Sequence, residues 1–299
     1  MADNYIVIVS KPEDLNTLIL GMNNIKKNLN PKKIIIISNK EAKKLFTNNN
    51  DVLFYDENEI VEGMTYGEVK KLILEKGGDV KYTGWYFQQF LKMGFSRVFN
   101  KNPYIVWDAD TLPLKEINFI DNGKYIFYVK NEYHKPYFDT IKILLNLKKI
   151  KKESFISEKM IIIPKYMNQL LDQIESNNCI QGDLFYEKVI NSITQKDINN
   201  AGFSEFETYG TFMENKYQDI YVEKEINTLR GGSLVFGNNI DGNLIEWLNK
   251  TTIIDTISFE RSQKGSKLCS IVSSKAVQKI ISPDIILKMY LKRYPSLIY

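Results

Sequence analysis

The chain has 299 residues, of which 43% are hydrophobic and 25% charged, so it can bury a sizeable core. Its formal net charge of +4 is too small to indicate a nucleic-acid-binding protein, although it suits an anionic substrate or membrane surface. One histidine excludes a His-rich zinc site and a Ser-His-Asp triad, and two widely spaced cysteines, Cys179 and Cys269, indicate free thiols in a reducing compartment.

The first residues contain no basic segment followed by an apolar one, so we expect no signal peptide. No apolar run reaches the roughly 20 residues that a membrane-spanning helix needs. We therefore expect a cytoplasmic protein, at most peripheral to the inner face of a membrane.

The N-terminal part alternates strands and helices. The β-branched run 5–9, helical spacing over 15–25, an apolar run at 34–37, a short helix at 41–46 and a strand at 52–55 predict a β-α-β-α-β unit. This order is typical of a Rossmann-type, mostly parallel sheet flanked by helices, in an α/β protein.

Further elements are expected along the rest of the chain. We expect helices at 66–75, 84–99, 168–175, 183–193 and 283–293, and strands at 104–107, 125–130, 155–164, around Gly231-Gly232 and at 253–259. We divide the chain into a catalytic domain of residues 1–262 and a C-terminal helical extension of residues 263–299.

The most informative segment is an apolar strand, Tyr104 to Trp107, that ends in Asp108 and Asp110. Residues i and i+2 of an extended chain point to one side, so both carboxylates can converge just past the strand end. Such oxygens suit Mg2+ or Mn2+, and open α/β sheets bind ligands at this edge. The alternative is turn chemistry, because Asp also favours turns and helix N-caps.

The expected helix 84–99 carries a polar face. Trp85, Gln88, Gln89 and Lys92 are spaced i, i+3, i+4, i+7, so they share one side of the helix. Two amides beside a tryptophan and a lysine form either a ligand surface or a half-buried face bonded to neighbouring loops.

The segment 203–210 places Glu205, Glu207 and Tyr209 among aromatic residues. Glu205 and Glu207 share a side if the segment is extended, and Glu205 and Tyr209 share one if it is helical. Aromatic surroundings can raise the pKa of a carboxyl group, which suits a general base. The plainer alternative is a capped helix start with a solvated glutamate.

Two loop residues and the C-terminal run are further candidates. His134 lies in a polar, aromatic loop of the kind that binds sugars, and Glu158 precedes an expected strand; either can instead be structural. The run from Lys275 to Tyr299 alternates apolar residues with Lys275, Lys279, Lys288, Lys292 and Arg293. It is either a basic helix that covers the domain or a helix that lies on an anionic membrane.

Together and in this order, these segments resemble a known group. The strand with its Asp-x-Asp resembles the DXD motif of GT-A-fold glycosyltransferases. Residues 84–89, 108–111, 154–160 and 203–210 are similar to segments of DUF6492, a bacterial family of unknown function found near surface-polysaccharide genes.

The resemblance implies transfer of a sugar from a nucleotide-diphosphate donor, with a UDP-sugar favoured, to a glycan or lipid-linked glycan in capsule or lipopolysaccharide synthesis. Asp110 and Asp108 would hold Mn2+ or Mg2+ against the donor diphosphate. Glu207, and next Glu205, would be the catalytic base. The remaining candidates are donor or nucleotide contacts at Ser10, Gln88, Gln89, Lys92 and Asp108, and acceptor or sugar contacts at His134, Glu158 and Tyr209. The chain departs from the GT-A pattern in having no histidine after His134 as a further metal ligand.

Two other functions remain open. The segment 105–112 also matches the nucleophile motif of HAD-type, Mg2+-dependent phosphatases, in which Asp108 would be the nucleophile; that motif usually follows the first strand of its domain. A non-catalytic nucleotide-sugar-binding protein is the second alternative.

Overall fold

The computed structural model describes residues 4–263, 265, 269–272 and 274–293. The chain forms two compact units that alternate along the sequence. Unit 1 contains Met1–Pro12, Lys32–Trp107 and Phe119–Lys224, and unit 2 contains Glu13–Pro31, Asp108–Asn118 and Glu225–Tyr299. Because this division follows spatial contacts, the expected domain boundary at residue 262 stays a prediction.

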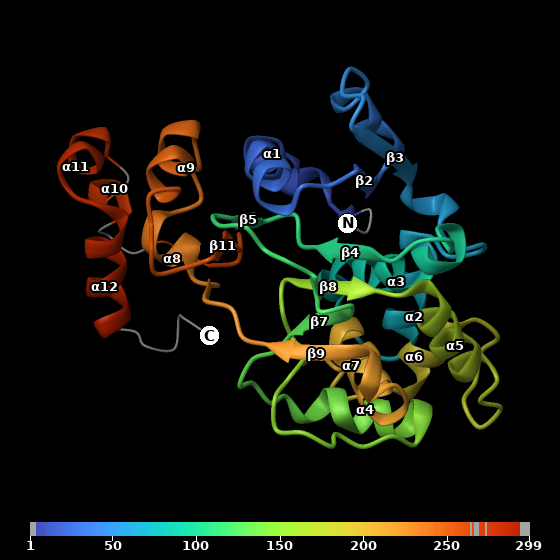
Figure 1. Cartoon of the computed structure of the whole chain (residues 1–299). Coiled ribbons are helices and arrows are strands. Elements are labelled where there is room, and N and C mark those ends of the chain that lie inside the picture. Colours follow the sequence, from blue (N-terminus) through green and yellow to red (C-terminus); the bar gives the residue numbers. More distant parts are fainter. Residues whose placement is uncertain (1–3, 264, 266–268, 273, 294–299) are drawn as a thin grey trace. The chain divides into compact units, whose positions relative to one another are not determined.

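The centre of unit 1 is a five-stranded sheet in the order β3-β2-β1-β4-β8 (Figure 1). Four strands are parallel and β8 is antiparallel to β4, which confirms the predicted mostly parallel α/β fold. The strands are β1 (Tyr5–Val9), β2 (Lys33–Ser38), β3 (Val52–Asp56), β4 (Tyr104–Trp107) and β8 (Lys159–Ile162).

The strand order creates a switch point between β1 and β4. The chain leaves β1 to form β2 on one side, and it returns to form β4 on the other side of β1. The carboxyl ends of β1 and β4 are therefore neighbours, and ligands of open α/β sheets bind beside such a point. Ser10 directly follows β1, and Asp108 directly follows β4.

Six α-helices of unit 1 accompany the sheet. They are α2 (Tyr66–Glu75), α3 (Thr83–Val98), α4 (Lys135–Leu145), α5 (Pro164–Glu175), α6 (Phe185–Ser192) and α7 (Glu205–Lys216). Helix α3 contacts β1, α2, α5 and α7, and it buries Tyr86, Phe90 and Phe95 completely. Burying such large apolar side chains supplies much of the driving force for packing.

Three expectations about unit 1 need correction. The loop expected after residue 130 becomes α4 at Lys135, because Pro136 lies in the first helical turn, where a missing N–H costs nothing. The strand expected over 155–164 is shorter, since only Lys159–Ile162 pairs with β4. The expected short helix at 41–46 is a 3-10 helix, Lys40–Leu45, whose N-cap is Asn39.

A smaller sheet in unit 1 joins β6 (Ile120–Asp121), β7 (Lys124–Tyr128) and β9 (Tyr221–Lys224). The strands β7 and β9 are parallel although nearly 100 residues separate them (Figure 1). Phe127 of β7 stacks on Tyr221 of β9, with ring centroids 4.5 Å apart.

Unit 2 has its own sheet and its own core. Its elements are α1 (Leu15–Leu29), β5 (Thr111–Pro113), β10 (Thr228–Leu229), α8 (Gly232–Phe236), α9 (Gly242–Leu248), β11 (Thr256–Ser258), α10 (Cys269–Val272), α11 (Lys275–Ile280) and α12 (Pro283–Arg293). The sheet order is β10-β11-β5. Gly232 begins α8 rather than lying in a strand turn, and α9 was not expected.

One hydrophobic cluster links distant parts of unit 2. It brings Leu112 from β5 together with Trp247 from α9, Ile257 from β11 and Leu287 from α12. The predicted C-terminal helix is confirmed at Pro283–Arg293, and it shares this core with earlier segments. Residues 294–299, the end of the basic run, lie outside the described residues. In the described part of the chain, no helix is both long and apolar enough to cross a membrane.

Candidate functional site

The Asp-x-Asp segment is a turn with a fixed backbone. Asp108 and Asp110 are half-buried, and the carbonyl of Asp108 accepts a hydrogen bond from the N–H of Thr111 at 3.1 Å. The hydroxyl of Thr111 lies 3.3 Å from a carboxylate oxygen of Asp110 and 2.7 Å from the hydroxyl of Ser258. The N–H of Phe259 donates to the carbonyl of Asp110 at 2.9 Å. Strand β11 therefore holds the segment on one side.

These residues meet part of the requirement for a divalent cation. Half-buried carboxylate oxygens are the donors that Mg2+ or Mn2+ prefers, and Mg2+ is commonly held by one or two carboxylates together with substrate phosphates. Among residues 4–263, 265, 269–272 and 274–293, no three His, Cys, Asp or Glu side chains gather in a way that could hold a metal ion. Asp108 and Asp110 would thus need oxygens from substrate or water to complete the coordination.

Three buried charges lie at the end of β4. Lys159 of β8 is opposite Trp107, the last residue of β4, and is completely buried. Its ammonium group lies 5.7 Å from the Trp107 ring centroid and 5.5 Å from that of Tyr128. Glu158 accepts a hydrogen bond from Lys130 at 2.6 Å and is 3.6 Å from Lys159. Burial this complete requires such pairing, because an unpaired charge loses its hydration.

Sequence reasoning named Glu158 but missed Lys130 and Lys159. Lys159 is followed by four apolar residues, and a lysine that begins an apolar strand is the one sequence signal that could have drawn attention to it. The structure gives Glu158 a role in holding two lysines, and its side chain is only 3% exposed.

The polar face of α3 is turned toward the start of α7. The ammonium group of Lys92 lies 2.7 Å from a carboxylate oxygen of Glu205, and 4.7 Å from the ring centroid of Phe206. The amide oxygen of Gln89 accepts the N–H of Glu205 at 3.0 Å, while Gln88 is half-buried. The sequence left two interpretations of this face, a ligand surface or a half-buried face bonded to neighbouring segments. The structure contains the bonds that the second interpretation requires.

Glu207 forms hydrogen bonds to the segment that contains Ser154 and Phe155. It is completely buried, and its carboxylate accepts hydrogen bonds from the hydroxyl of Ser154, the N–H of Phe155 at 3.0 Å and the ammonium of Lys149 at 3.3 Å. Burial raises the pKa of Glu207, although Lys149 and these donors oppose the shift. Within the segment 203–210, helix α7 begins at Glu205, and Ser204 caps it by accepting the N–H of Glu207 at 3.2 Å.

The sequence matches the model of a protein family described as "Family of unknown function (DUF6492)" over residues 14–239. This match covers well over half of the chain. The protein is a DUF6492 member.

The fold of this DUF6492 protein has distant counterparts among solved structures. The galactosyltransferase LgtC, in complex with donor and acceptor sugar analogs, superposes with a TM-score of 0.42 and 10% identity, over 85% of this chain and 86% of that chain. The bifunctional glycosyltransferase WbbM gives 0.43 and 11% over 86% and 46%. The glycosyltransferase GlyE of Streptococcus pneumoniae TIGR4 gives 0.41 and 9% over 100% and 65%. At these values the likeness assigns no activity, and no functionally curated protein matches the chain.

The other predicted contacts of the DUF6492 protein are engaged within unit 1. Ser10 is buried, and its hydroxyl donates to the carbonyl of Lys11 at 3.1 Å. His134 precedes α4, with its Nε2 atom 2.9 Å from the carbonyl of Asn200. Tyr209 is completely buried; its hydroxyl accepts the N–H of Ile163 at 3.1 Å, and burial raises its pKa. The assignments of these residues to donor or acceptor stay predictions.

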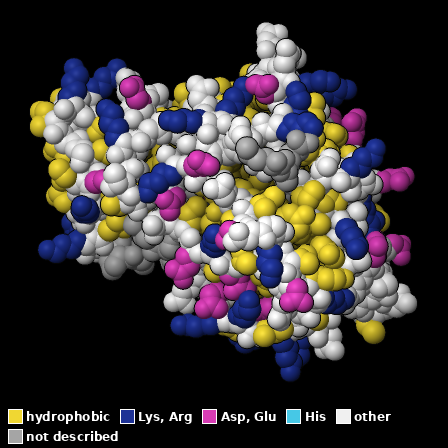
Figure 2. All heavy atoms as spheres, in the orientation of Figure 1, with side chains coloured by type: hydrophobic (Ala, Val, Ile, Leu, Met, Phe, Trp, Pro, Cys, Tyr) yellow, Lys and Arg dark blue, Asp and Glu magenta, His cyan; other side chains and the backbone are white. Residues whose placement is uncertain are grey.

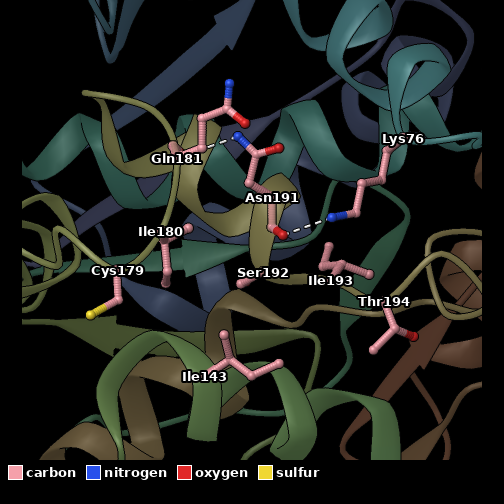
Figure 3. Close-up of a pocket in the computed structure, with 9 residues that line it drawn as sticks. All are labelled: Lys76, Ile143, Cys179, Ile180, Gln181, Asn191, Ser192, Ile193 and Thr194. Carbon is pink, nitrogen blue, oxygen red and sulfur yellow. Dashed lines mark hydrogen bonds between the residues drawn. The ribbon is translucent and has the colours of Figure 1, made fainter.

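A pocket of about 380 Å³ in the DUF6492 protein has none of the predicted site residues in its lining (Figure 3). Its lysine, Lys76, donates to the carbonyl of Asn191 at 2.7 Å at the end of α6, and burial lowers the Lys76 pKa. The contact caps the helix by meeting a carbonyl that has no partner within the helix.

Proposed function

We propose that this protein is a GT-A-like glycosyltransferase that moves a sugar from a nucleotide-diphosphate donor to a hydroxyl acceptor. One observation carries the proposal: in the sequence, Asp108 and Asp110 come just after β4, which is one of the two strands that border the switch point of the parallel sheet. Carboxylates at this edge suit a ligand that brings its own phosphate-bound cation. Motifs shared with DUF6492 and with DXD glycosyltransferases favour a sugar nucleotide as that ligand.

The chemistry divides between ligand and chain. In transfer, the bond from the anomeric carbon to the diphosphate oxygen breaks, and a bond to the acceptor oxygen forms while the acceptor hydroxyl loses its proton. Bound Mn2+ or Mg2+ would neutralise charge on the leaving diphosphate. Asp108 and Asp110 would orient that cation, with Asp108 also able to bind the ribose.

Two glutamates are candidates for the catalytic base. Glu207 and Glu205 are 0% and 6% exposed, and each is ion-paired with a lysine. A general base must come within hydrogen-bond reach of the acceptor hydroxyl. We therefore propose that both act first as positioning residues, with Glu207 holding the segment around Ser154 and Glu205 holding Lys92. The prediction that one of them removes the proton is tested by replacing each with Gln and comparing pH–rate profiles.

The wider context follows from the resemblance. We propose a UDP-sugar donor, a glycan or lipid-linked glycan acceptor, and a place in the assembly of capsule or lipopolysaccharide on the cytoplasmic side of a membrane.

The test compares two aspartates. Asp110→Asn should lower metal-dependent hydrolysis of a matching UDP-sugar by on the order of 100-fold and weaken UDP binding in Mn2+. Asp219→Asn removes an exposed carboxylate from unit 1 and serves as the control. Full activity and full UDP–Mn2+ affinity in Asp110→Asn would contradict the proposal.

A thermal-shift screen of sugar nucleotides finds the donor, because a ligand that binds only the folded state raises the melting temperature. A phosphatase assay on simple phosphomonoesters separates the proposal from the HAD alternative. Phosphate release that depends on Asp108 would favour the phosphatase.

A further inference from the structure

Helix α12 of unit 2 has two faces of different character. Ile286 and Leu287 are buried in the core of unit 2. The exposed face carries Ile285 and Met289, which are 52% and 67% exposed and lie four residues apart. A helix that rests only on its own domain normally turns polar side chains outward, so these exposed apolar residues need a reason.

Lysines flank the exposed apolar residues. Lys288 and Lys292 lie on the same side of α12 as Ile285 and Met289, because the four positions are spaced i, i+3, i+4 and i+7. At the end of α11, Lys279 is exposed and Ile280 is 85% exposed. We call these six residues, Lys279, Ile280, Ile285, Lys288, Met289 and Lys292, the α11–α12 face.

The surroundings of this face are also basic. A hollow of about 290 Å³ beside α11 is lined by three lysines, Lys250, Lys275 and Lys279, and by one carboxylate, Glu246, with Trp247 also in its wall. The indole N–H of Trp247 donates to the carbonyl of Ile281 at 2.9 Å and so fixes the chain between α11 and α12.

Acidic residues are few here. From Lys275 to Arg293 the chain has five cationic side chains and one carboxylate, Asp284. That carboxylate accepts hydrogen bonds from Thr251 and Thr252. In Figure 2, hydrophobic side chains lie among lysine and arginine side chains on the part of the surface formed by α11 and α12.

We propose that the α11–α12 face docks on an anionic lipid membrane, with Ile280, Ile285 and Met289 entering the headgroup region and Lys279, Lys288 and Lys292 contacting lipid phosphates. Charge complementarity selects this partner. Apolar side chains surrounded by ammonium groups are the arrangement of interfacial helices. A second copy would present the same positive face and be repelled, and nucleic acid would give the exposed isoleucines nothing to bury against. The docking does not depend on the sugar-transfer proposal.

Vesicle binding tests the proposal. The full chain is sedimented with phosphatidylcholine vesicles, alone and with phosphatidylglycerol added. We expect binding only to the anionic vesicles, weakening as salt is raised. The triple variant Lys279→Gln, Lys288→Gln, Lys292→Gln should bind roughly 100-fold more weakly, because each cation near the surface contributes about fivefold. Ile280→Ser, Ile285→Ser, Met289→Ser should also release the protein.

Matched controls come from unit 1. Lys43→Gln, Lys44→Gln, Lys70→Gln removes the same charge from exposed positions, and Leu74→Ser, Ile143→Ser, Ile150→Ser removes apolar side chains that are 48%, 46% and 56% exposed. Both controls should bind like the unmodified protein. Donor hydrolysis in solution should be unchanged in all four variants, so a failure of docking is distinct from a failure of the proposed activity.

Three results would overturn the proposal. They are equal binding to neutral and anionic vesicles, equal losses in the α11–α12 and control variants, and a dimer in sedimentation velocity that the Ser variant dissociates while vesicles stay unbound.

Discussion

Replacing Lys92 by Met should destabilise unit 1 strongly. Lys92 and Glu205 are 4% and 6% exposed, and their charged atoms lie 2.7 Å apart. Removing the ammonium group leaves the Glu205 carboxylate in a site that water barely reaches. Breaking one side of such a buried pair typically costs about 3–5 kcal/mol. For a chain of this size that corresponds to a fall in melting temperature of roughly 6–10 °C.

The double variant Lys92→Met, Glu205→Gln isolates the pair. Because the amide has no charge to compensate, it should recover most of the loss, and the N–H of residue 205 can still donate to Gln89. Lys224→Met is the control, since the pair of Lys224 and Asp121 is 45% and 37% exposed and should matter little.

Differential scanning calorimetry of the four proteins measures these shifts. A fall for Lys92→Met no larger than that for Lys224→Met, or a double variant less stable than Lys92→Met, would refute the reasoning. Titration of UDP with Mn2+ into the double variant then shows whether Lys92 contributes to donor binding or only to the stability of unit 1. Unchanged affinity would mean that Lys92 serves the structure alone.

Three further predictions concern unit 1. Burial raises the pKa of Glu207 above its ordinary 4.5, so the folded state holds that proton more tightly than the unfolded state. The contribution of this proton to the free energy of unfolding is fully present below pH 4.5 and is lost as pH rises through the raised pKa. The free energy of unfolding of Glu207→Gln, measured with urea across this range, should therefore fall least below that of the unmodified protein at the higher pH. Gly210→Ala should destabilise by about 1–3 kcal/mol, because an added Cβ would lie 2.1 Å from Phe155, whereas Gly84→Ala meets no atom within 4 Å and should be neutral or stabilising in thermal melts. Lys159→Met should lower the melting temperature, because it removes one of the two lysines that face the buried Glu158, and Lys159→Arg should restore part of the loss; an unchanged melting temperature in the Met variant would contradict this role of Lys159.

The central sheet was predictable because its signals are local. Ile34 to Ile37 are all completely buried. The continuous apolar run in the sequence therefore corresponds to a strand that is covered on both faces. Helix α2 was expected at its observed bounds, since its cap Thr65 and its apolar spacing both lie within the segment.

Helix α7 was left undecided for a physical reason. Polar residues such as Thr208, Thr211 and Glu214 are as deeply buried in it as Phe212, so the alternation of polar and apolar faces that marks an amphipathic helix is missing. Its buried carboxylates are balanced by partners far away in sequence, such as Lys92 for Glu205.

The charge clusters share this obstacle. Lys130 and Glu158 are 28 residues apart, and Lys92 and Glu205 are 113 apart. No spacing rule connects such pairs, because only the tertiary fold brings them within hydrogen-bond distance. The Asp108-x-Asp110 segment could be recognised in the sequence because its interpretation needs only the strand directly before it.

The pairing of β5 with β11 has a consequence for synthesis of the chain. Thr111 and Ser258, which contact each other through their hydroxyls, are 147 residues apart. At a translation rate of about 5–20 residues per second, the segment that carries Asp110 must wait roughly 7–30 s on the ribosome before its partner strand exists. Until then β5 is an open edge that can pair wrongly. A nascent chain stalled before residue 256 should therefore be prone to aggregation and dependent on chaperones, even though the strands of the large sheet are already complete.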